Sequence, residues 1–201
     1  MHTKLKLLSL SSLLALSHYA QADWVDDAVA ANDAHVIQLR EHIHQHPELG
    51  NIEFETSKLV QKELKSYGIE VKTGYAKTGV IGILKGAKPG PVMAMRADMD
   101  ALPIKEDTGL PFASKHEGKM HACGHDAHTS VGLGVAEILA SLQEELAGTV
   151  KLIFQPAEEG TRGAKAIVDK GVVDDVQYML GAHTGEAPAG SIACHVGHFL
   201  A

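Results

Sequence analysis

The side chains most able to hold a metal ion gather between Met120 and His128, in the segment Met-His-Ala-Cys-Gly-His-Asp-Ala-His. Its three histidines, one cysteine and one aspartate are typical ligands of zinc and similar ions. Cys123 and His125 alternate, so their side chains share one face if the backbone is extended there. Asp126 occupies the position of a helix N-cap ahead of an apolar run, so we expect a loop that leads into a helix. The segment predicts a metal site, and surface histidines beside a structural thiol are the alternative.

Further possible metal ligands follow three predicted strands elsewhere in the chain. Asp98 and Asp100 come directly after an apolar run, two residues apart, and point toward the same edge of the predicted sheet. Glu158 and Glu159 follow another apolar run, and His183 follows a third. Turn chemistry is the alternative for the aspartates, and a pair of solvated charges is the alternative for the glutamates. Beside a metal site, one glutamate could bind the ion, the other could act as general base on a metal-bound water, and an aspartate could orient a histidine.

The elements that must position these donors follow from hydrophobic periodicity and turn residues. Predicted helices cover residues 23–46, 55–67, 126–145 and 163–170, and predicted strands cover residues 69–71, 80–84, 92–95, 149–154 and 178–180. Alternating strands and helices predict an α/β fold with a mixed sheet flanked by helices. The spacing of His42, His44 and His46 at the end of the first helix favours helix-end and surface histidines over ligands.

Composition bounds the class of protein. The chain has 201 residues, 45% of them hydrophobic, which suits one α/β domain with a substantial core. The formal net charge is -7 and lysines are scattered, so we expect no nucleic acid partner. Cys123 and Cys194 are the only cysteines, too few for a disulfide framework.

The first residues predict an export signal. A basic start and an apolar stretch from Leu5 to Leu16 precede Ala20-Gln21-Ala22, which matches an A-x-A cleavage site. We therefore expect a signal peptide at residues 1–22, export to the periplasm or beyond, and no stable membrane insertion after cleavage. An uncleaved anchor and an ordinary N-terminal helix are the alternatives. In an oxidising compartment, Cys123 and Cys194 could also form a disulfide.

Four motifs occur together in the chain and give a resemblance to a known family. They are His-Pro-Glu-Leu-Gly at residues 46–50, Arg-Ala-Asp-Met-Asp-Ala-Leu-Pro at 96–103, His-Ala-Cys-Gly-His-Asp at 121–126 and Phe-Gln-Pro-Ala-Glu-Glu-Gly at 154–160. In this order they resemble the metal-dependent amidohydrolases of the aminoacylase and carboxypeptidase family. Members of that family include hippurate hydrolase, indole-acetyl-amino-acid hydrolases and the A subunit of p-aminobenzoyl-glutamate hydrolase.

The resemblance implies a role for each matching residue. Glu158 falls on the general base, and Asp100 falls on the aspartate that orients the site. The metal ligands fall on Cys123, His125, Glu159 and His183. The implied cofactors are two divalent ions, zinc or manganese, and the implied reaction is hydrolysis of the amide bond of an N-acyl amino acid, a small-molecule substrate.

Family members are longer than this sequence. They carry an inserted lid domain, used for association into a homodimer or hetero-oligomer, and a further histidine ligand downstream. The resemblance therefore implies that residues 23–201 are the N-terminal part of the catalytic domain, that the chain alone is not a competent hydrolase, and that a sheet edge is exposed. Two alternatives stay open: a thiol hydrolase with Cys123 as nucleophile and His121 or His125 as base, and a metal-binding or interaction module without activity.

Overall fold

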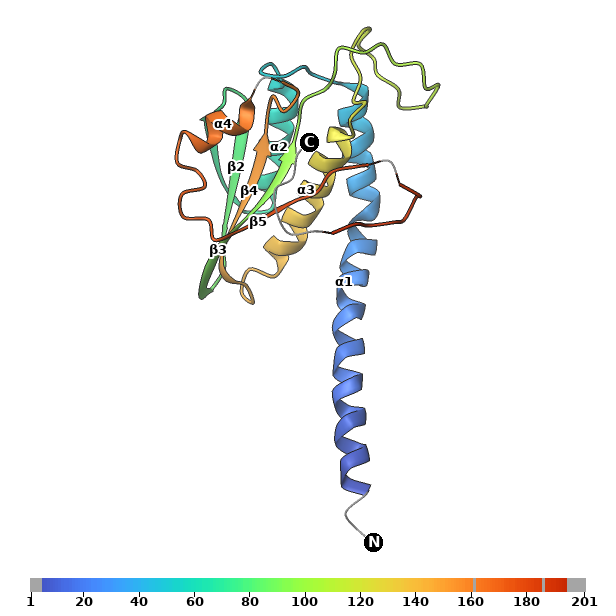
Figure 1. Cartoon of the computed structure of the whole chain (residues 1–201), viewed down its shortest axis with the longest axis vertical. Helices are drawn as coiled ribbons and strands as arrows, with labels where there is room; N and C mark the ends of the chain where they lie inside the picture. Colours follow the sequence, from blue (N-terminus) through green and yellow to red (C-terminus); the bar gives the residue numbers. More distant parts are fainter. Residues whose placement is uncertain (1–4, 161, 186, 195–201) are drawn as a thin grey trace.

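A computed structural model describes residues 5–160, 162–185 and 187–194, and only the backbone of residues 5–23. Its elements are, in chain order, α1 (Leu5–Gln45), α2 (Phe54–Ser66), β1 (Glu70–Tyr75), β2 (Gly79–Lys85), β3 (Lys88–Asp98), α3 (His125–Ser141), β4 (Ala147–Gln155), α4 (Gly163–Val168) and β5 (Tyr178–Gly181). The mixed sheet flanked by helices that the sequence predicts is confirmed (Figure 1).

The sheet brings the ends of three strands to one edge. Its strand order is β1-β2-β4-β3-β5, with antiparallel pairing from β1 to β4 and parallel pairing of β3 with both β4 and β5. The register pairs Asp98 with Gln155 and Arg96 with Gly181. Because β3, β4 and β5 run the same way, the loops that follow them begin at the same carboxyl edge, where ligands bind in open α/β sheets.

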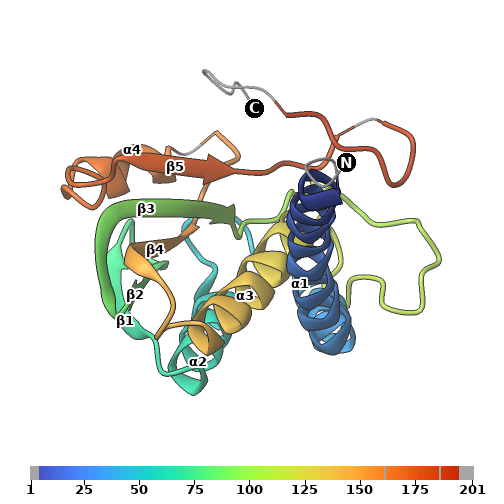
Figure 2. The same ribbon diagram turned by 90° about the horizontal axis from the view of Figure 1, so that it is seen from below.

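Both faces of the sheet are covered. Val80, Leu152 and Phe154 belong to a core that the helices α1, α2 and α3 complete, whereas Ile81 and Ile153 pack toward α4 on the other face. Figure 2 shows the three long helices on one side of the sheet and α4 on the other. Neighbouring residues of one strand point to opposite faces, which explains this division. Each buried aliphatic or aromatic side chain contributes roughly 1.5–3 kcal/mol to stability.

The helix α1 packs on the domain through its C-terminal part. Leu39 and Ile43 are buried, and a Cβ at Gly134 of α3 would lie only 2.5 Å from a methyl carbon of Val36. Glycine at position 134 thus allows α1 and α3 to approach closely. Toward its N-terminus α1 extends away from the sheet (Figure 1). Within the described part of the chain, none of the helices combines the length and the hydropathy that a membrane crossing requires.

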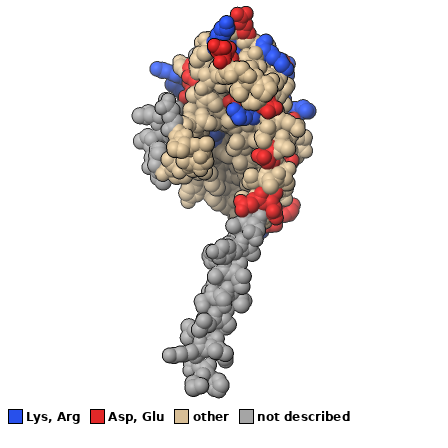
Figure 3. Space-filling view, turned by 90° about the vertical axis from the view of Figure 1, so that its right-hand side faces the viewer, with Lys and Arg blue, Asp and Glu red and all other residues tan. Residues whose placement is uncertain are grey.

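Charged side chains are mixed over the surface seen in Figure 3, where acidic groups gather close to the point at which α1 leaves the domain. At one edge of the sheet, β5 exposes 61% of Tyr178, 55% of Met179 and 59% of Leu180. These three neighbouring residues leave apolar surface open to solvent at that edge.

The prediction that Asp126 is an N-cap is wrong. Gly124 is the N-cap of α3, with a left-handed φ of 84°, and His125 is the first helical residue. Glycine adopts this conformation without the steric cost that a Cβ imposes. The same helix ends at Ser141 instead of near residue 145, because residues 142–145 form turns.

Candidate metal centre

The carboxyl edge of the sheet brings the four predicted ligands together. One ligand atom from each of Cys123, His125 and Glu159 lies within 4.8 Å of the others. His183, beyond the end of β5, places its Nε2 atom 3.5 Å from Cys123 Sγ. Sulfur, imidazole nitrogen and carboxylate oxygen are the donor types that zinc accepts. Three of the four predicted ligands thus converge, and His183 approaches one of them.

The atoms of His125 fit a metal ligand. Its Nδ1 donates a hydrogen bond to the carbonyl oxygen of Asp100 at 2.7 Å, so in the neutral imidazole the lone pair is on Nε2. That Nε2 atom is buried and has no hydrogen-bond partner, and the side chain is fully buried. An unsatisfied buried acceptor is costly unless a cation or another donor meets it. His183 is oriented in the same way, since its Nδ1 lies 2.6 Å from the carbonyl oxygen of Thr184.

A second group of possible ligands overlaps the first and consists of Asp98, His125, His128 and His183. Both nitrogens of His128 are already used: Nδ1 donates to Asp98 Oδ1 at 2.6 Å, and Nε2 accepts the Thr184 N–H at 2.8 Å. The other oxygen of Asp98 lies 2.6 Å from Arg96 Nη1. Asp98 and His128 therefore support the site as a hydrogen-bond network, and the group with Cys123 and Glu159 is the better metal site.

Asp100 holds the loop that carries both glutamates. Its Oδ1 accepts the N–H of Glu158 and its Oδ2 accepts the N–H of Glu159, each at 2.9 Å. Burial opposes ionisation of this carboxyl, but the hydrogen bonds from His125 and from the two N–H groups outweigh it and lower the pKa of Asp100. Glu158 Oε2 lies 3.9 Å from His125 Nε2, so the predicted base faces the ligand group.

Glu53 holds the same loop from the opposite side, and the sequence analysis missed it. This fully buried carboxylate accepts the N–H of Ala157 at 2.8 Å and the hydroxyl of Thr78 at 2.5 Å. Ala157 has a φ of 55°, a left-handed conformation that costs about 1–2 kcal/mol in a residue with a Cβ. The only signal in the sequence was an acidic residue at the start of a predicted helix, which ordinarily indicates capping.

His44 is not the surface histidine that its spacing predicted. It is 4% exposed, with Nδ1 2.9 Å from Asp126 Oδ2 and Nε2 3.2 Å from Glu106 Oε1. Arg40 adds a hydrogen bond to the same oxygen of Asp126 at 3.2 Å. The end of α1 is thus bound to the first turn of α3, beside the ligand His125.

The geometry opposes a thiol hydrolase. Burial and the neighbouring Glu159 raise the pKa of Cys123 to about 11, so the free thiol stays protonated near neutral pH. Burial lowers the pKa of His121, one of the two bases considered for that alternative, to about 4. Cys123 and Cys194 are both free, so the disulfide alternative is not formed here. A bound cation would instead lower the pKa of Cys123, because it stabilises the thiolate.

Known proteins share sequence and fold with this chain. The sequence profile of Peptidase family M20/M25/M40 matches residues 94–197. An N-acetyl-L-cysteine deacetylase from Bacillus subtilis is 45% identical over 167 residues, which cover 83% of this chain and 40% of that protein. An IAA-amino acid hydrolase from Arabidopsis thaliana is 54% identical over 148 residues, or 74% of this chain and 34% of the hydrolase. The chain spans less than half the length of these curated relatives.

Solved structures show the same fold. A dinuclear metal binding peptidase from the M20 family of Bacillus subtilis matches with a TM-score of 0.75 and 47% identity, over 78% of this chain and 44% of that one. An aminobenzoyl-glutamate utilization protein from Klebsiella pneumoniae matches with a TM-score of 0.67 and 31% identity, over 80% of this chain and 46% of that one. Fold and donor set together define an α/β metal-binding domain. The chain belongs to Peptidase family M20/M25/M40, which confirms the resemblance inferred from the four motifs.

Proposed function

We propose that this chain supplies the metal-binding and proton-transferring part of an amidohydrolase that cleaves the amide bond of N-acyl amino acids. The observation that carries the proposal is the convergence of Cys123, His125 and Glu159 within 4.8 Å, with the buried Nε2 of His125 unpaired and Glu158 beside it. The names of two relatives describe deacetylation of N-acetyl-L-cysteine and hydrolysis of IAA-amino acids, which supports this class of substrate.

The residues that would hold the two divalent ions are Cys123, His125, Glu159 and His183. A thiolate among the donors favours zinc over manganese. When bound, such an ion acts as a Lewis acid toward the scissile carbonyl and makes a water molecule more acidic. The remaining chemistry belongs to the chain.

Glu158 takes the proton from the attacking water and passes it to the nitrogen of the departing amine. Asp100 positions this base, because it binds the backbone N–H groups of both glutamates and also contacts His125. Glu53 fixes the preceding Ala157 from the other side. Because the backbone is held at two points, the two glutamate side chains can keep separate roles. Glu158 would act on the reacting water, and Glu159 would bind the metal.

The test compares Glu158→Gln with Glu159→Gln in the full-length protein. Each substitution keeps the backbone N–H that Asp100 accepts, so each is a matched control for the other. Glu158→Gln should lower kcat by about 10²–10⁴-fold, the usual contribution of a general base, and leave the metal content intact. Glu159→Gln should lower metal occupancy. The opposite pattern would show that the roles are exchanged, and undiminished turnover in Glu158→Gln would exclude Glu158 as the base.

We also propose that the protein is exported and that Ala22 is the last residue removed. The basic start, the apolar stretch and the A-x-A ending support this proposal. Protein purified from its native host should begin at Asp23 on N-terminal sequencing. Mature soluble protein that retains Met1 would contradict it.

A further inference from the structure

A second group of metal donors lies outside the metal centre, at the C-terminal end of α1. His42 and His46 are one helical turn apart, and their ring centroids are separated by 4.9 Å. His116 belongs to the loop between β3 and α3, and its ring centroid lies 5.6 Å from that of His46. The metal centre uses none of these three residues, which we call the histidine cluster.

Two atoms of the histidine cluster already have the spacing of ligands on one ion. His46 Nδ1 lies 3.4 Å from His116 Nε2. Zinc–nitrogen bonds of about 2.0–2.1 Å at a tetrahedral angle place two nitrogen ligands roughly 3.3–3.4 Å apart. The two nitrogens therefore have the separation that a shared ion requires, although they now face each other as a hydrogen-bonded pair and both rings would turn their lone pairs toward the ion.

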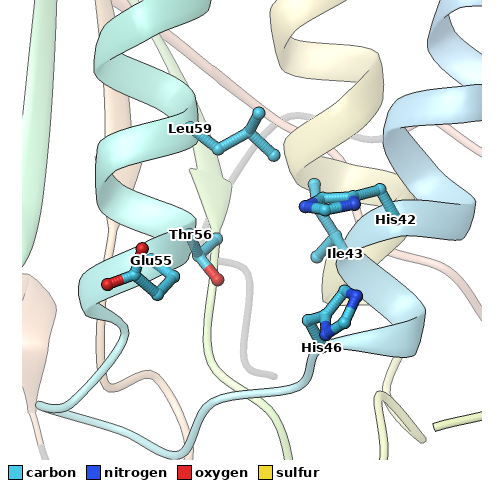
Figure 4. A pocket seen from close by; sticks show the side chains of 6 residues that line it. All are labelled: His42, Ile43, His46, Glu55, Thr56 and Leu59. Carbon is cyan, nitrogen blue, oxygen red and sulfur yellow. The ribbon is translucent and has the colours of Figure 1, made fainter. Parts of the chain in front are cut away.

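His42 can complete the group from the same helix. Figure 4 shows His42 and His46 extending from α1 beside a pocket whose opposite wall is formed by Thr56 and Leu59 of α2. His42 packs against the His46 ring and is exposed, so neighbouring side chains do not fix its rotamer. Rotamer changes of exposed side chains take only picoseconds to nanoseconds.

The backbone around His116 is held against α1 before any ion arrives. Lys115 donates its N–H to the carbonyl oxygen of Gln45 at 2.9 Å and its amine to the side-chain oxygen of Gln45 at 2.5 Å. The N–H of His116 donates to Ser114 Oγ at 3.1 Å. This preorganisation reduces the entropy cost of gathering ligands from two segments of the chain.

The amine of Lys115 is directed to Gln45, which leaves the facing nitrogens of His46 and His116 to each other.

We propose that His42, His46 and His116 form a second metal site, which binds a divalent ion of the zinc type and fastens the loop between β3 and α3 to α1. The loop spans residues 99–124 and contains no helix or strand, although a bridge between Leu102 and Met120 closes its base. An ion held by both segments stabilises the closed arrangement by mass action, because the unfolded chain does not present the three ligands together. The role is structural, since the site is separate from Glu158.

The probe for this site is Co²⁺, which reports sulfur ligands separately. Cobalt bound beside Cys123 gives a sulfur-to-metal charge-transfer band, whereas cobalt bound by imidazoles alone gives only ligand-field bands. We call cobalt that gives the charge-transfer band the sulfur class, and cobalt that gives only ligand-field bands the ligand-field class. We expect the double variant His42→Gln/His116→Gln to bind ligand-field-class cobalt at least about tenfold more weakly than wild type. Its binding of sulfur-class cobalt should be unchanged. Both residues are exposed, so glutamine is tolerated at these positions. His35→Gln, elsewhere on α1, is the matched control and should keep both classes.

A second measurement follows the loop directly. Added Zn²⁺ should slow amide hydrogen exchange in residues 103–119 of the wild-type protein, and the double variant should lose that protection. Equal ligand-field binding by wild type and double variant would overturn the proposal. So would unchanged exchange of the loop in wild-type protein saturated with Zn²⁺. Binding in the sulfur class concerns the metal centre alone, so failure of the proposed function is separable from failure of this one.

Discussion

Replacing Asp100 by asparagine is the sharpest test of how the metal centre is held together. The carboxylate accepts two backbone N–H groups, from Glu158 and Glu159, in a site that is 1% exposed. Asparagine offers one oxygen and one NH₂ group, so one of the two N–H donors would face another donor. Loss of a charge-assisted hydrogen bond and an unsatisfied buried N–H each cost about 1–3 kcal/mol.

We therefore expect Asp100→Asn to lower the free energy of unfolding of the metal-free protein by about 2–4 kcal/mol. Zinc affinity should fall by about 10–100-fold, because the position of the loop that carries Glu159 depends on this carboxylate. Urea unfolding measures the first quantity, and competition with a chelator measures the second.

Asp169→Asn is the control. Asp169 forms an exposed ion pair with Lys165 one turn earlier on the surface, so its loss should cost about 0.5 kcal/mol or less. If Asp100→Asn matched this control in stability and bound zinc as tightly as the wild type, the loop would not depend on Asp100 and the reasoning would fail.

Three further predictions follow from the loop and the thiol. Burial raises the pKa of Glu53 above 4.5, so the native state binds more protons than the unfolded state and the stability that Glu53 contributes falls as pH rises through its native pKa. In urea titrations, wild type should thus lose stability relative to Glu53→Gln as pH rises above about 4.5, the ordinary pKa of a glutamate. Gly163→Ala should destabilise by about 2 kcal/mol or more, because a Cβ would lie 1.7 Å from the Pro156 carbonyl oxygen. In metal-free protein near neutral pH, iodoacetamide should alkylate exposed Cys194 well before Cys123, whose pKa is about 11.

Each of these has an outcome that contradicts it. A constant stability difference between wild type and Glu53→Gln across this pH range would mean that Glu53 does not titrate abnormally. Gly185→Ala, where an added Cβ meets nothing within 4 Å, is the control for Gly163→Ala and should be nearly neutral. Alkylation of Cys123 as fast as that of Cys194 would restore the thiol hydrolase as a candidate.

The candidate ligands could be selected from the sequence because each lies just beyond a strand or at a helix start. Apolar runs locate the strands, and parallel strands place their ends at one edge, so Glu159 and His183 are expected at the same edge. Cys123 lies at the end of the long loop after β3, and its donor type rather than its place after a strand predicted it. Their individual roles came from the family resemblance, since spacing alone cannot separate a ligand from a base. The assignment of Glu158 and Glu159 remains a prediction.

What could not be predicted depends on contacts between distant segments. Glu53 binds Ala157 across more than a hundred positions of sequence, and no local pattern announces such a pair. His44 becomes buried only when α1 packs on α3, so helical spacing could not distinguish it from a surface residue. The sequence predicts a strand that starts at residue 92, but β3 already begins at Lys88. Glycine and proline ordinarily interrupt strands, but here Gly148 of β4 lets the Pro91 backbone approach closely.

The parallel pairing of β3 with β4 has a consequence for the order of folding. Asp98 and Gln155 pair in register, and closing the loop of about 57 residues between them costs roughly 3–4 kcal/mol of chain entropy. The metal donors follow β3, β4 and β5 separately, so no complete ligand set exists until these strands have joined. A metal ion should therefore bind after the rate-limiting step: it should leave the refolding rate unchanged and slow unfolding alone. Released from denaturant, the chain would build its sheet first and acquire its ions last.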